Sequence, residues 1–202
     1  METVDKLCYE NRAQQLGHRY ICGCDEVGRG PLAGPVVCAS VILPLDDIIF
    51  GIDDSKKLSA KKRKTLSEII KNKAISYKIS FKSEKIVDEI NILNATKRAM
   101  EECINGMDVK PDFALIDAVT GLDLVCDSQS IIGGDAKSYL IGAASILAKV
   151  ARDEYMENID SAYSQYGFAK HKGYGTKEHM EALRKYGPCE IHRKSFLKFL
   201  EK

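Results

Sequence analysis

The sequence "CDEVGRGPLAGPVV", residues 24–37, joins two apolar runs through a segment rich in turn-forming residues. The first run, 20–25, and the second, 36–43, carry the β-branched and apolar residues typical of buried strands. Three glycines and Pro35 between them are strong turn signals. We therefore expect the two runs to pair as a hairpin, which is the first unit of a predicted sheet.

Asp25 and Glu26 are adjacent carboxylates at the end of the first run. Neighbouring residues of a regular strand point to opposite faces, so both can serve one site only where the strand bulges or ends. Gly28 and Gly30 follow closely, and glycine tolerates the positive φ values that such an irregularity requires. We therefore expect a break in the strand that turns both carboxylates inward.

The rest of the chain predicts strands that alternate with helices, followed by helices alone. The expected elements are a helix over 60–73 with Leu66, Ile69 and Ile70 inward, strands over 75–81, 113–117 and 124–132, a helix that Ser83 caps, a long helix from residue 138, and a helix over 177–186 that Thr176 caps. This order predicts a mixed α/β sheet with a helical C-terminal section.

The composition is typical of a globular protein with a sizeable core. The chain has 202 residues, of which 45% are hydrophobic and 29% charged. No apolar run is long enough to span a bilayer, and the N-terminal residues lack the apolar stretch of a secretory signal. The seven cysteines show neither a Cys-x-x-Cys pair nor zinc-site spacing, which favours reduced, structural thiols. These features predict a cytoplasmic protein.

Three buried-looking segments end on carboxylates. The first ends on Asp25-Glu26, "FALID" ends on Asp117, and "SIIGGD" ends on Asp135. Carboxylates at strand ends are costly when unpaired, because burial and mutual repulsion both oppose their ionisation. Their recurrence indicates a shared purpose, most simply the binding of hard divalent cations by oxygen ligands. The spacing is too irregular for a calcium-binding helix–loop–helix motif.

Two cationic features allow more than one interpretation. Glycine on both sides of Arg29 would let the backbone approach a ligand closely, and the arginine would offer a cationic fork to phosphate. Taken alone, however, Gly-x-Gly is more often a simple turn. The segment "KKLSAKKRK", 56–64, holds six cations, which is equally typical of a solvated helix face.

Seven segments, read in order over roughly residues 20–197, resemble bacterial ribonuclease HII, the type 2 ribonuclease H family. They are "DEVGRGPLAGPVV", "DSKKLS", "LIDA", "GDAKS", "AASILAKVARD", "GFAKHKGYGT" and "IHRKSF". The resemblance implies a ribonuclease H-like α/β fold with a central mixed five-stranded sheet, flanking helices and a helical C-terminal extension. It also implies a catalytic core over 1–160 and an extension over 161–202 that packs on the core, as one functional domain.

The same resemblance implies an endonuclease that hydrolyses the RNA strand of RNA–DNA hybrids and cuts at ribonucleotides embedded in duplex DNA. Cleavage would leave 5′-phosphate and 3′-hydroxyl ends. The implied catalytic residues, which would hold two Mg²⁺ or Mn²⁺ ions, are Asp25, Glu26, Asp117 and Asp135.

The implied substrate contacts follow from the requirement to distinguish RNA from DNA, which differ at the 2′-hydroxyl. The backbone of Gly28, Arg29 and Gly30 would read that hydroxyl, and Tyr174 would pack against the sugar that follows the ribonucleotide. Lys56 and Lys57 would contact the backbone of the duplex.

Ser145, Arg152 and Asp153 lie in the predicted long helix. Asp153 is the rival of Asp135 as fourth metal ligand, and Arg152 with Asp153 is interpreted as an internal polar pair. Ser145 is interpreted as a small residue that permits close packing. The sequence departs from the family before the fourth carboxylate, where it has Gly133 in place of the usual lysine.

Two other classes of function are compatible with parts of the pattern. A non-catalytic hybrid-binding protein of the same fold would be expected to have lost one of the first three carboxylates, and none is lost. A recombinase or transposase that cuts DNA would not need the Gly-Arg-Gly reader or Tyr174. The expected substrates are RNA–DNA hybrids and DNA that contains ribonucleotides, with no membrane partner, and we expect a monomer. Contact with a replication clamp stays open, because "SFLKFLEK" at the C-terminus fits either a docking tail or a packed helix.

Overall fold

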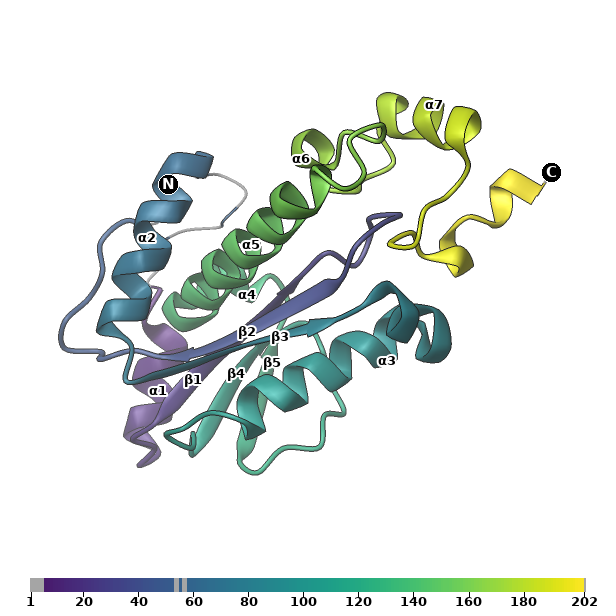
Figure 1. The fold of residues 1–202 in the computed structure, drawn as a ribbon. Coiled ribbons are helices and arrows are strands. Elements are labelled where there is room, and N and C mark those ends of the chain that lie inside the picture. The colour runs from purple at the N-terminus through teal and green to yellow at the C-terminus, as the bar shows by residue number, and fades with distance from the viewer. Residues whose placement is uncertain (1–5, 53–54, 56–57, 202) are drawn as a thin grey trace.

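The computed structural model describes residues 6–52, 55 and 58–201 of the chain. Figure 1 shows a twisted sheet with helices on both of its faces. The strands are β1 (Ile21–Val27), β2 (Val36–Ile42), β3 (Ser76–Lys82), β4 (Phe113–Asp117) and β5 (Asp127–Ile131). The helices are α1 (Cys8–Gln15), α2 (Ala60–Lys73), α3 (Glu84–Asn105), α4 (Gly134–Lys137), α5 (Tyr139–Asp160), α6 (Phe168–His171) and α7 (Lys177–Tyr186), followed by two 3₁₀ turns, Lys194–Phe196 and Lys198–Glu201.

The five strands form one mixed sheet in the order β3-β2-β1-β4-β5. The first three strands are antiparallel neighbours, as the expected hairpin requires, and β4 and β5 run parallel to β1. The predicted five-stranded α/β fold with flanking helices is therefore confirmed. The parallel pair β1 and β4 lies at the centre of the sheet, so the carboxyl ends of these two strands lie side by side.

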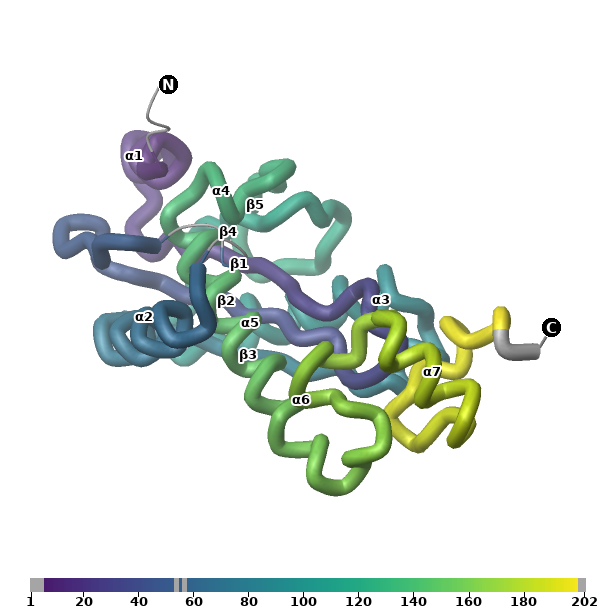
Figure 2. The backbone as a smooth tube through the Cα atoms, turned by 90° about the horizontal axis from the view of Figure 1, so that it is seen from above, coloured from purple at the N-terminus to yellow at the C-terminus, as the bar shows by residue number. Residues whose placement is uncertain are grey.

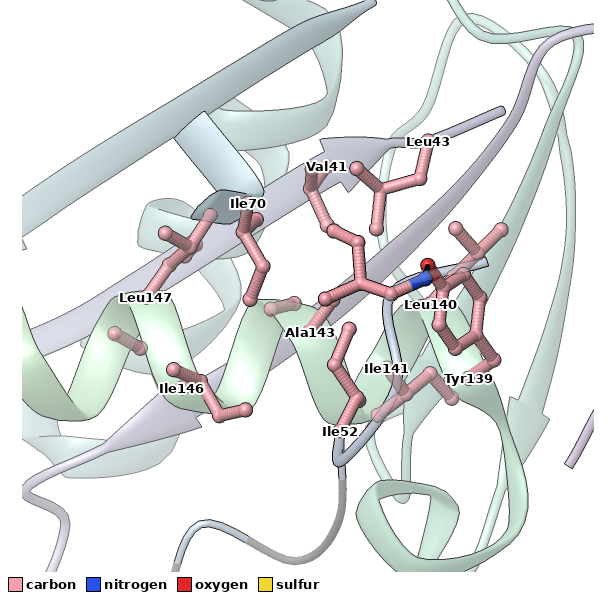
Figure 3. Close-up of a cluster of buried hydrophobic side chains, with 14 of the residues drawn as sticks. Val41, Leu43, Ile52, Ile70, Tyr139, Leu140, Ile141, Ala143, Ile146 and Leu147 are labelled. Carbon is pink, nitrogen blue, oxygen red and sulfur yellow. Dashed lines mark hydrogen bonds between the residues drawn. The ribbon is translucent and has the colours of Figure 1, made fainter. Parts of the chain in front are cut away.

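One face of the sheet is covered by α5, with α2 and α1 packed beside it (Figure 1). Figure 3 shows Val41 of β2, Ile70 of α2 and Leu147 of α5 in this cluster, and all three are buried. Close packing of α5 requires a glycine on β1, because a Cβ at Gly23 would overlap the backbone of Leu140. This contact fixes α5 directly over β1, the strand that carries Asp25 and Glu26.

The opposite face is covered by α3 (Figure 1), which buries Met100, Cys103 and Ile104 against the sheet. Cys22 and Cys24 of β1 point into this second cluster. All seven cysteines are free thiols; Cys22, Cys24, Cys38 and Cys103 are buried, as the prediction of structural cysteines requires, whereas Cys8 is exposed.

The N-terminus of α5 is capped by residues from two parts of the chain. The Ser138 hydroxyl accepts from the Ile141 N–H at 3.2 Å, as an ordinary N-cap does. The buried carboxylate of Glu10 on α1 accepts from the Ser138 hydroxyl at 2.6 Å and from the Leu140 N–H at 3.0 Å. An anion at this position interacts favourably with the helix dipole, so α1 anchors the start of α5.

The segment after α5 forms a third cluster at the far end of the sheet (Figure 2). Its buried members include Phe168, Leu183 and Ile191, together with Ala33 from the loop between β1 and β2. Three backbone hydrogen bonds join this loop to the C-terminal segment: Leu32 N–H to Gly173 O at 2.9 Å, Gly34 N–H to Ile191 O at 2.8 Å, and Arg193 N–H to Leu32 O at 2.9 Å.

Two local predictions are wrong. Strand β1 does not break at the carboxylates, because Asp25 and Glu26 stay in register with Ala39 and Cys38 and the pairing continues to Val27. Ile69 does not face inward, since 38% of it is exposed, while Leu66 and Ile70 are buried as expected. Among the described helices, none is both long and apolar enough to cross a membrane.

Candidate active site

Three carboxylates meet at the carboxyl ends of β1 and β4. Asp25, Glu26 and Asp117 each place an oxygen so that all three oxygens lie within 4.8 Å of one another. Asp25 is 5% exposed, and the other two are half-buried. The structure therefore brings together the first three of the four predicted metal ligands.

Adjacent residues reach one site here because the neighbouring strand ends first. The last paired residues of the two strands are Cys24 of β1 and Ile116 of β4, so the edge of β1 is uncovered from Asp25 onward. Asp25 points to the α5 face, where its carboxylate bonds to the Ser145 hydroxyl. Glu26 lies on the other face by alternation, and its longer side chain reaches the cluster around the open edge. A strand break is not needed.

Burial and mutual repulsion dominate the electrostatics of the cluster. The pKa of Asp25 is raised well above its usual range, first by burial and then by the charges of Glu26 and Asp117. The pKa of Glu26 is also raised, mainly by burial, although Arg29 opposes this shift from 3.4 Å. Two carboxylates with raised pKa values beside a third carboxylate are typical of a site that binds a cation.

The donor atoms of the cluster fit a hard divalent metal. The Glu26 Oε2 atom is buried without a hydrogen-bond partner among the described residues, which leaves it available as a ligand. The Gly134 N–H donates to Asp117 Oδ1 at 2.6 Å, and the Glu26 N–H donates to Asp25 Oδ1 at 2.7 Å. These bonds orient the carboxylates, and an all-oxygen set is the kind that Mg²⁺ and Mn²⁺ prefer.

The two candidates for a fourth ligand differ clearly. Asp135 follows Gly134 in the first turn of α4, so its backbone starts beside Asp117, but its carboxylate lies outside the group of three. Asp153 is held by Lys149 at 2.6 Å and faces Arg63 at 3.9 Å. Asp153 is thus neutralised by cations, and the role of Asp135 stays a prediction. Lys56 and Lys57 lie outside the described residues.

Sequence reasoning missed a pair of serines behind Asp25. The Ser145 hydroxyl bonds to Asp25 and also lies 2.9 Å from the Ser55 hydroxyl, and both serines are buried. Ser145 is therefore more than a small packing residue. The signal available in the sequence was Ser55 in the "DSKKLS" segment. Ser55 lies beside α5, and its carbonyl oxygen accepts a hydrogen bond from Arg63 at 2.8 Å.

The Arg152 side chain connects two of the predicted substrate residues, Gly28 and Tyr174. Gly28 packs against the side chain of Arg152, and the same guanidinium carbon lies 5.8 Å from the centre of the Tyr174 ring. Tyr174 is 42% exposed, and Arg29 and Gly30 are exposed. Arg152 does not pair with Asp153 as predicted, because it donates instead to Pro35 O at 3.0 Å and Ala33 O at 3.1 Å.

Comparison with known proteins decides the family. The sequence model of ribonuclease HII matches residues 22–199. The chain belongs to the ribonuclease HII family. The ribonuclease HII of Acetivibrio thermocellus is 53% identical over 195 residues, which cover 96% of this chain and 76% of the relative. The ribonuclease HII of Caldicellulosiruptor bescii is 53% identical over 94% of this chain and 92% of the relative.

Solved ribonuclease structures share the fold. Ribonuclease H2 from Pyrococcus horikoshii superposes with a TM-score of 0.77 at 25% identity, covering 91% of this chain and 98% of that one. The ribonuclease HII in a PCNA complex from Archaeoglobus fulgidus gives 0.76 at 25% identity, covering 88% and 94%. A Bst ribonuclease HIII solved with Mn²⁺ gives 0.69 at 18% identity, covering 99% and 75%.

Membership of the ribonuclease HII family makes this chain an enzyme, a metal-dependent ribonuclease that cleaves the RNA strand of RNA–DNA hybrids. The cluster of Asp25, Glu26 and Asp117 is the group in the described residues that could hold such a metal.

Proposed function

We propose that this ribonuclease HII also incises duplex DNA at single embedded ribonucleotides, and that Asp25, Glu26, Asp117 and Asp135 hold two Mg²⁺ or Mn²⁺ ions for the reaction. The observation that carries the proposal is the meeting of three carboxylates, from β1 and β4, within 4.8 Å, followed in the chain by a Gly-Arg-Gly loop whose Arg29 and Gly30 are exposed. A Bst ribonuclease HIII of the same fold was solved in complex with Mn²⁺, which supports a divalent metal as cofactor.

The residues of the chain hold and orient groups rather than attack the substrate. Asp25 and Asp117 are oriented by hydrogen bonds from the backbone N–H groups of Glu26 and Gly134. When bound, two divalent ions supply the charge that activates a water and stabilises the leaving 3′-oxygen, which gives 5′-phosphate and 3′-hydroxyl ends. No serine or cysteine nucleophile is required.

Selectivity is assigned to the loop and to Tyr174. The backbone at Gly28, Arg29 and Gly30 reads the 2′-hydroxyl, the group that separates RNA from DNA. The exposed Tyr174 ring packs on the next sugar, where a 2′-hydroxyl would clash, so an RNA-to-DNA step is preferred. Lys56 and Lys57 remain proposed contacts to the duplex backbone.

The test is a cleavage assay on a duplex with one ribonucleotide and on the matched all-DNA duplex, with Mg²⁺, Mn²⁺ or chelator. The wild-type enzyme is expected to cut only the first duplex and only with metal. Asp25→Asn and Asp117→Asn are expected to lose cleavage by a factor of about 10³ or more while still binding the duplex, because each removes a ligand but no substrate contact.

Two further variants separate the candidates for the fourth ligand. Asp135→Asn is expected to reduce cleavage strongly, whereas Asp153→Asn should act only through stability, since it breaks an ion pair with Lys149. Full activity of Asp25→Asn or Asp117→Asn would refute the metal role of the cluster. Equal cutting of both wild-type substrates would refute the proposed selectivity.

Contact with a sliding clamp is proposed from one structural neighbour. The Archaeoglobus fulgidus ribonuclease HII was solved in complex with PCNA, and its fold matches this chain. Size-exclusion chromatography of the enzyme with and without a purified clamp tests both this contact and the expected monomer. Co-elution supports the contact, and separate elution of the two proteins at micromolar concentration contradicts it.

A further inference from the structure

Arg193 is a buried cation that contacts the loop between β1 and β2 from inside the protein. It is 0% exposed and lies just after α7 in the chain, 164 residues from Arg29. Its Nη2 donates to Gly28 O at 2.6 Å, its Nη1 to Arg29 O at 3.0 Å, and its Nε to Gly34 O at 3.0 Å. One planar fork therefore holds three carbonyl oxygens of a single loop.

These contacts are made at a cost. All three hydrogen bonds go to backbone carbonyls, although a buried guanidinium is usually paired with a carboxylate. Burial, together with the nearby cation Arg152, lowers the pKa of Arg193 to about 9. An apolar side chain here would leave these carbonyls without their donor, so the desolvated guanidinium fixes how they point, and the position calls for a functional explanation.

The geometry of the peptide bond provides one. The Gly28 carbonyl shares its peptide unit with the Arg29 N–H, and the Arg29 carbonyl shares its unit with the Gly30 N–H. No cis peptide occurs in the described residues, and in a trans peptide the C=O and N–H point in opposite directions. Because Arg193 holds both carbonyls on the buried side, the N–H groups of Arg29 and Gly30 face away from it.

The surroundings of the two N–H groups leave both donors accessible to a ligand. Arg29 and Gly30 are exposed, and no backbone carbonyl of the described residues accepts from either N–H. A Cβ added to Gly30 would meet nothing within 4 Å, so there is open space in front of it. Two adjacent donors beside an open surface can converge on one acceptor oxygen.

We propose that Arg193 is the positioning residue for recognition of the ribose 2′-oxygen: by holding the carbonyls of Gly28 and Arg29, it presents the N–H groups of Arg29 and Gly30 to that atom. The inference rests on the proposed function of the loop. It adds a residue from the C-terminal segment, remote in sequence from the loop, whose effect on substrate choice is indirect.

Arg152 provides a matched control. It is also 0% exposed and holds two carbonyls of the same loop, those of Ala33 and Pro35. The first of these peptide units carries the Gly34 N–H, which already donates to Ile191 O, and the second carries the N–H of Val36 within β2. Neither unit therefore presents a donor to a substrate.

The experiment compares Arg193→Lys with Arg152→Lys. Each keeps the charge but loses the planar fork, because a lysine ammonium is a point charge on a flexible stem. Dissociation constants are measured without divalent metal, so that nothing is cut, for a duplex with one ribonucleotide and for its all-DNA match. The next sugar is deoxyribose in both duplexes, so effects through Tyr174 cancel in the ratio of the two constants.

Arg193→Lys is expected to lower this preference for the ribonucleotide by about tenfold or more, toward equal binding, while affinity for the all-DNA duplex changes by less than about twofold. Arg152→Lys is expected to lower thermal stability but to keep the ratio. An unchanged ratio in Arg193→Lys, or an equal loss of ratio in both variants, overturns the role of Arg193. A wild-type enzyme that binds and cuts both duplexes equally instead removes the proposed function itself.

A measurement on the wild-type protein decides the case where Arg193→Lys does not fold. In amide-resolved NMR without divalent metal, the Arg29 and Gly30 N–H groups are expected to exchange rapidly with water in the free enzyme. They should shift on addition of the ribonucleotide duplex, and much less with the all-DNA duplex. Slow exchange of both amides in the free enzyme, or equal shifts with the two duplexes, contradicts the proposal.

Discussion

Gly28 and Gly30 lie two residues apart on the same loop, but their surroundings differ. Gly28 has a φ of +91°, and a Cβ there would overlap the Arg152 side chain and lie 2.8 Å from the Pro35 carbonyl oxygen. Gly30 has neither a positive φ nor a neighbour within 4 Å of a Cβ. The fold therefore requires glycine at position 28 only, and the glycine at position 30 is explained by a substrate that approaches the backbone.

A pair of alanine variants tests this distinction. Gly28→Ala is expected to lose about 1–3 kcal/mol of stability through strain and overlap, with activity falling as a consequence. Gly30→Ala should keep its unfolding free energy within about 0.5 kcal/mol but lose cleavage at a single ribonucleotide by about tenfold or more. Urea unfolding and kcat/KM on the same preparations give both quantities. A fully active Gly30→Ala enzyme would show that no ligand approaches this residue closely.

We expect Asp25 to stabilise a bound cation at the expense of the metal-free fold. Its pKa is raised by burial, by Glu26 and by Asp117, so stability present below the ordinary pKa of 3.8 is lost as the pH rises through the folded value. Without metal at pH 7.5, Asp25→Asn is expected to melt about 2–4 °C above the wild-type enzyme, the shift that about 1 kcal/mol produces in a chain of this size.

Adding Mg²⁺ or Mn²⁺ should raise the melting temperature of the wild-type protein, since ligand binding to the folded state stabilises it. The shift should be smaller for Asp25→Asn. The exposed carboxylate of Asp127 offers a control, because Asp127→Asn should leave both melting temperatures and the metal-dependent shift unchanged. An Asp25→Asn variant that melts lower in chelator would mean that the carboxylate is already well compensated without metal.

At the scale of elements, the sequence predicted most strands and helices, but it did not predict how β1 meets β4. The pairing and apolar pattern of residues 20–43 were sufficient for the hairpin, and Thr176 capped the last helix as expected. The carboxylate geometry depends on the β1–β4 pairing ending at Cys24 and Ile116 while β1 continues to Val27, and that register between distant segments is not encoded locally. Likewise, no periodicity marks α1, whose Glu10 matters only because it reaches the start of α5.

The histidines of α6, α7 and the following segment form a network of neutral rings, rather than a metal site. The Tyr174 carbonyl can only accept, so His179 Nδ1 donates to it at 2.9 Å and His179 Nε2 must accept. His192 Nδ1 accepts from the Cys189 N–H at 2.9 Å, which leaves its Nε2–H to donate to His179 at 3.0 Å. The His171 ring stacks on His179 at 4.5 Å. A proton added to His179 Nε2 would place its N–H group opposite the Nε2–H group of His192.

Acidification should therefore destabilise this region. Burial, followed by the charge of His179, lowers the pKa of His192 from 6.5 to about 4. The folded state thus disfavours the proton that the unfolded chain binds, so the contribution of His192 to stability is complete above pH 6.5 and is lost as the pH falls toward 4. Melting temperatures between pH 7.5 and 4.5 should fall less steeply for His192→Gln than for the wild-type enzyme.

The comparison of slopes is necessary because Glu10 and Asp25, whose pKa values are raised, change stability in the opposite sense over part of this range. Parallel curves for wild-type and His192→Gln proteins would show that the buried pair tolerates the added proton.

At the scale of the whole molecule, the division into a core over 1–160 and an extension over 161–202 stays a prediction. The contacts between the two parts indicate that they form one unit. The loop that bears Arg29 belongs to the core in sequence, yet Ala33 of this loop is buried in the cluster that holds Phe168, Leu183 and Ile191 of the extension. The extension also supplies Gly173, Ile191 and Arg193 as hydrogen-bond partners of that loop. The loop proposed to recognise the ribose is therefore held by both parts.

Shared contacts of this kind predict cooperative unfolding. Leu183 is 2% exposed in the cluster of the extension, and Leu183→Ala is expected to cost about 2–4 kcal/mol. If the chain unfolds as one unit, the amides of Leu32 and Gly34, which bond to the extension, and those of the central sheet should lose hydrogen-exchange protection by the same amount. Leu66→Ala, which truncates a buried side chain on α2, should produce the same uniform loss from the other end of the molecule. In Leu183→Ala, the loss of protection could instead be confined to residues 161–202 and their partners in the loop. That result would establish the extension as a separate folding unit. The loop that bears Arg29 could then open while the carboxylate cluster stays folded.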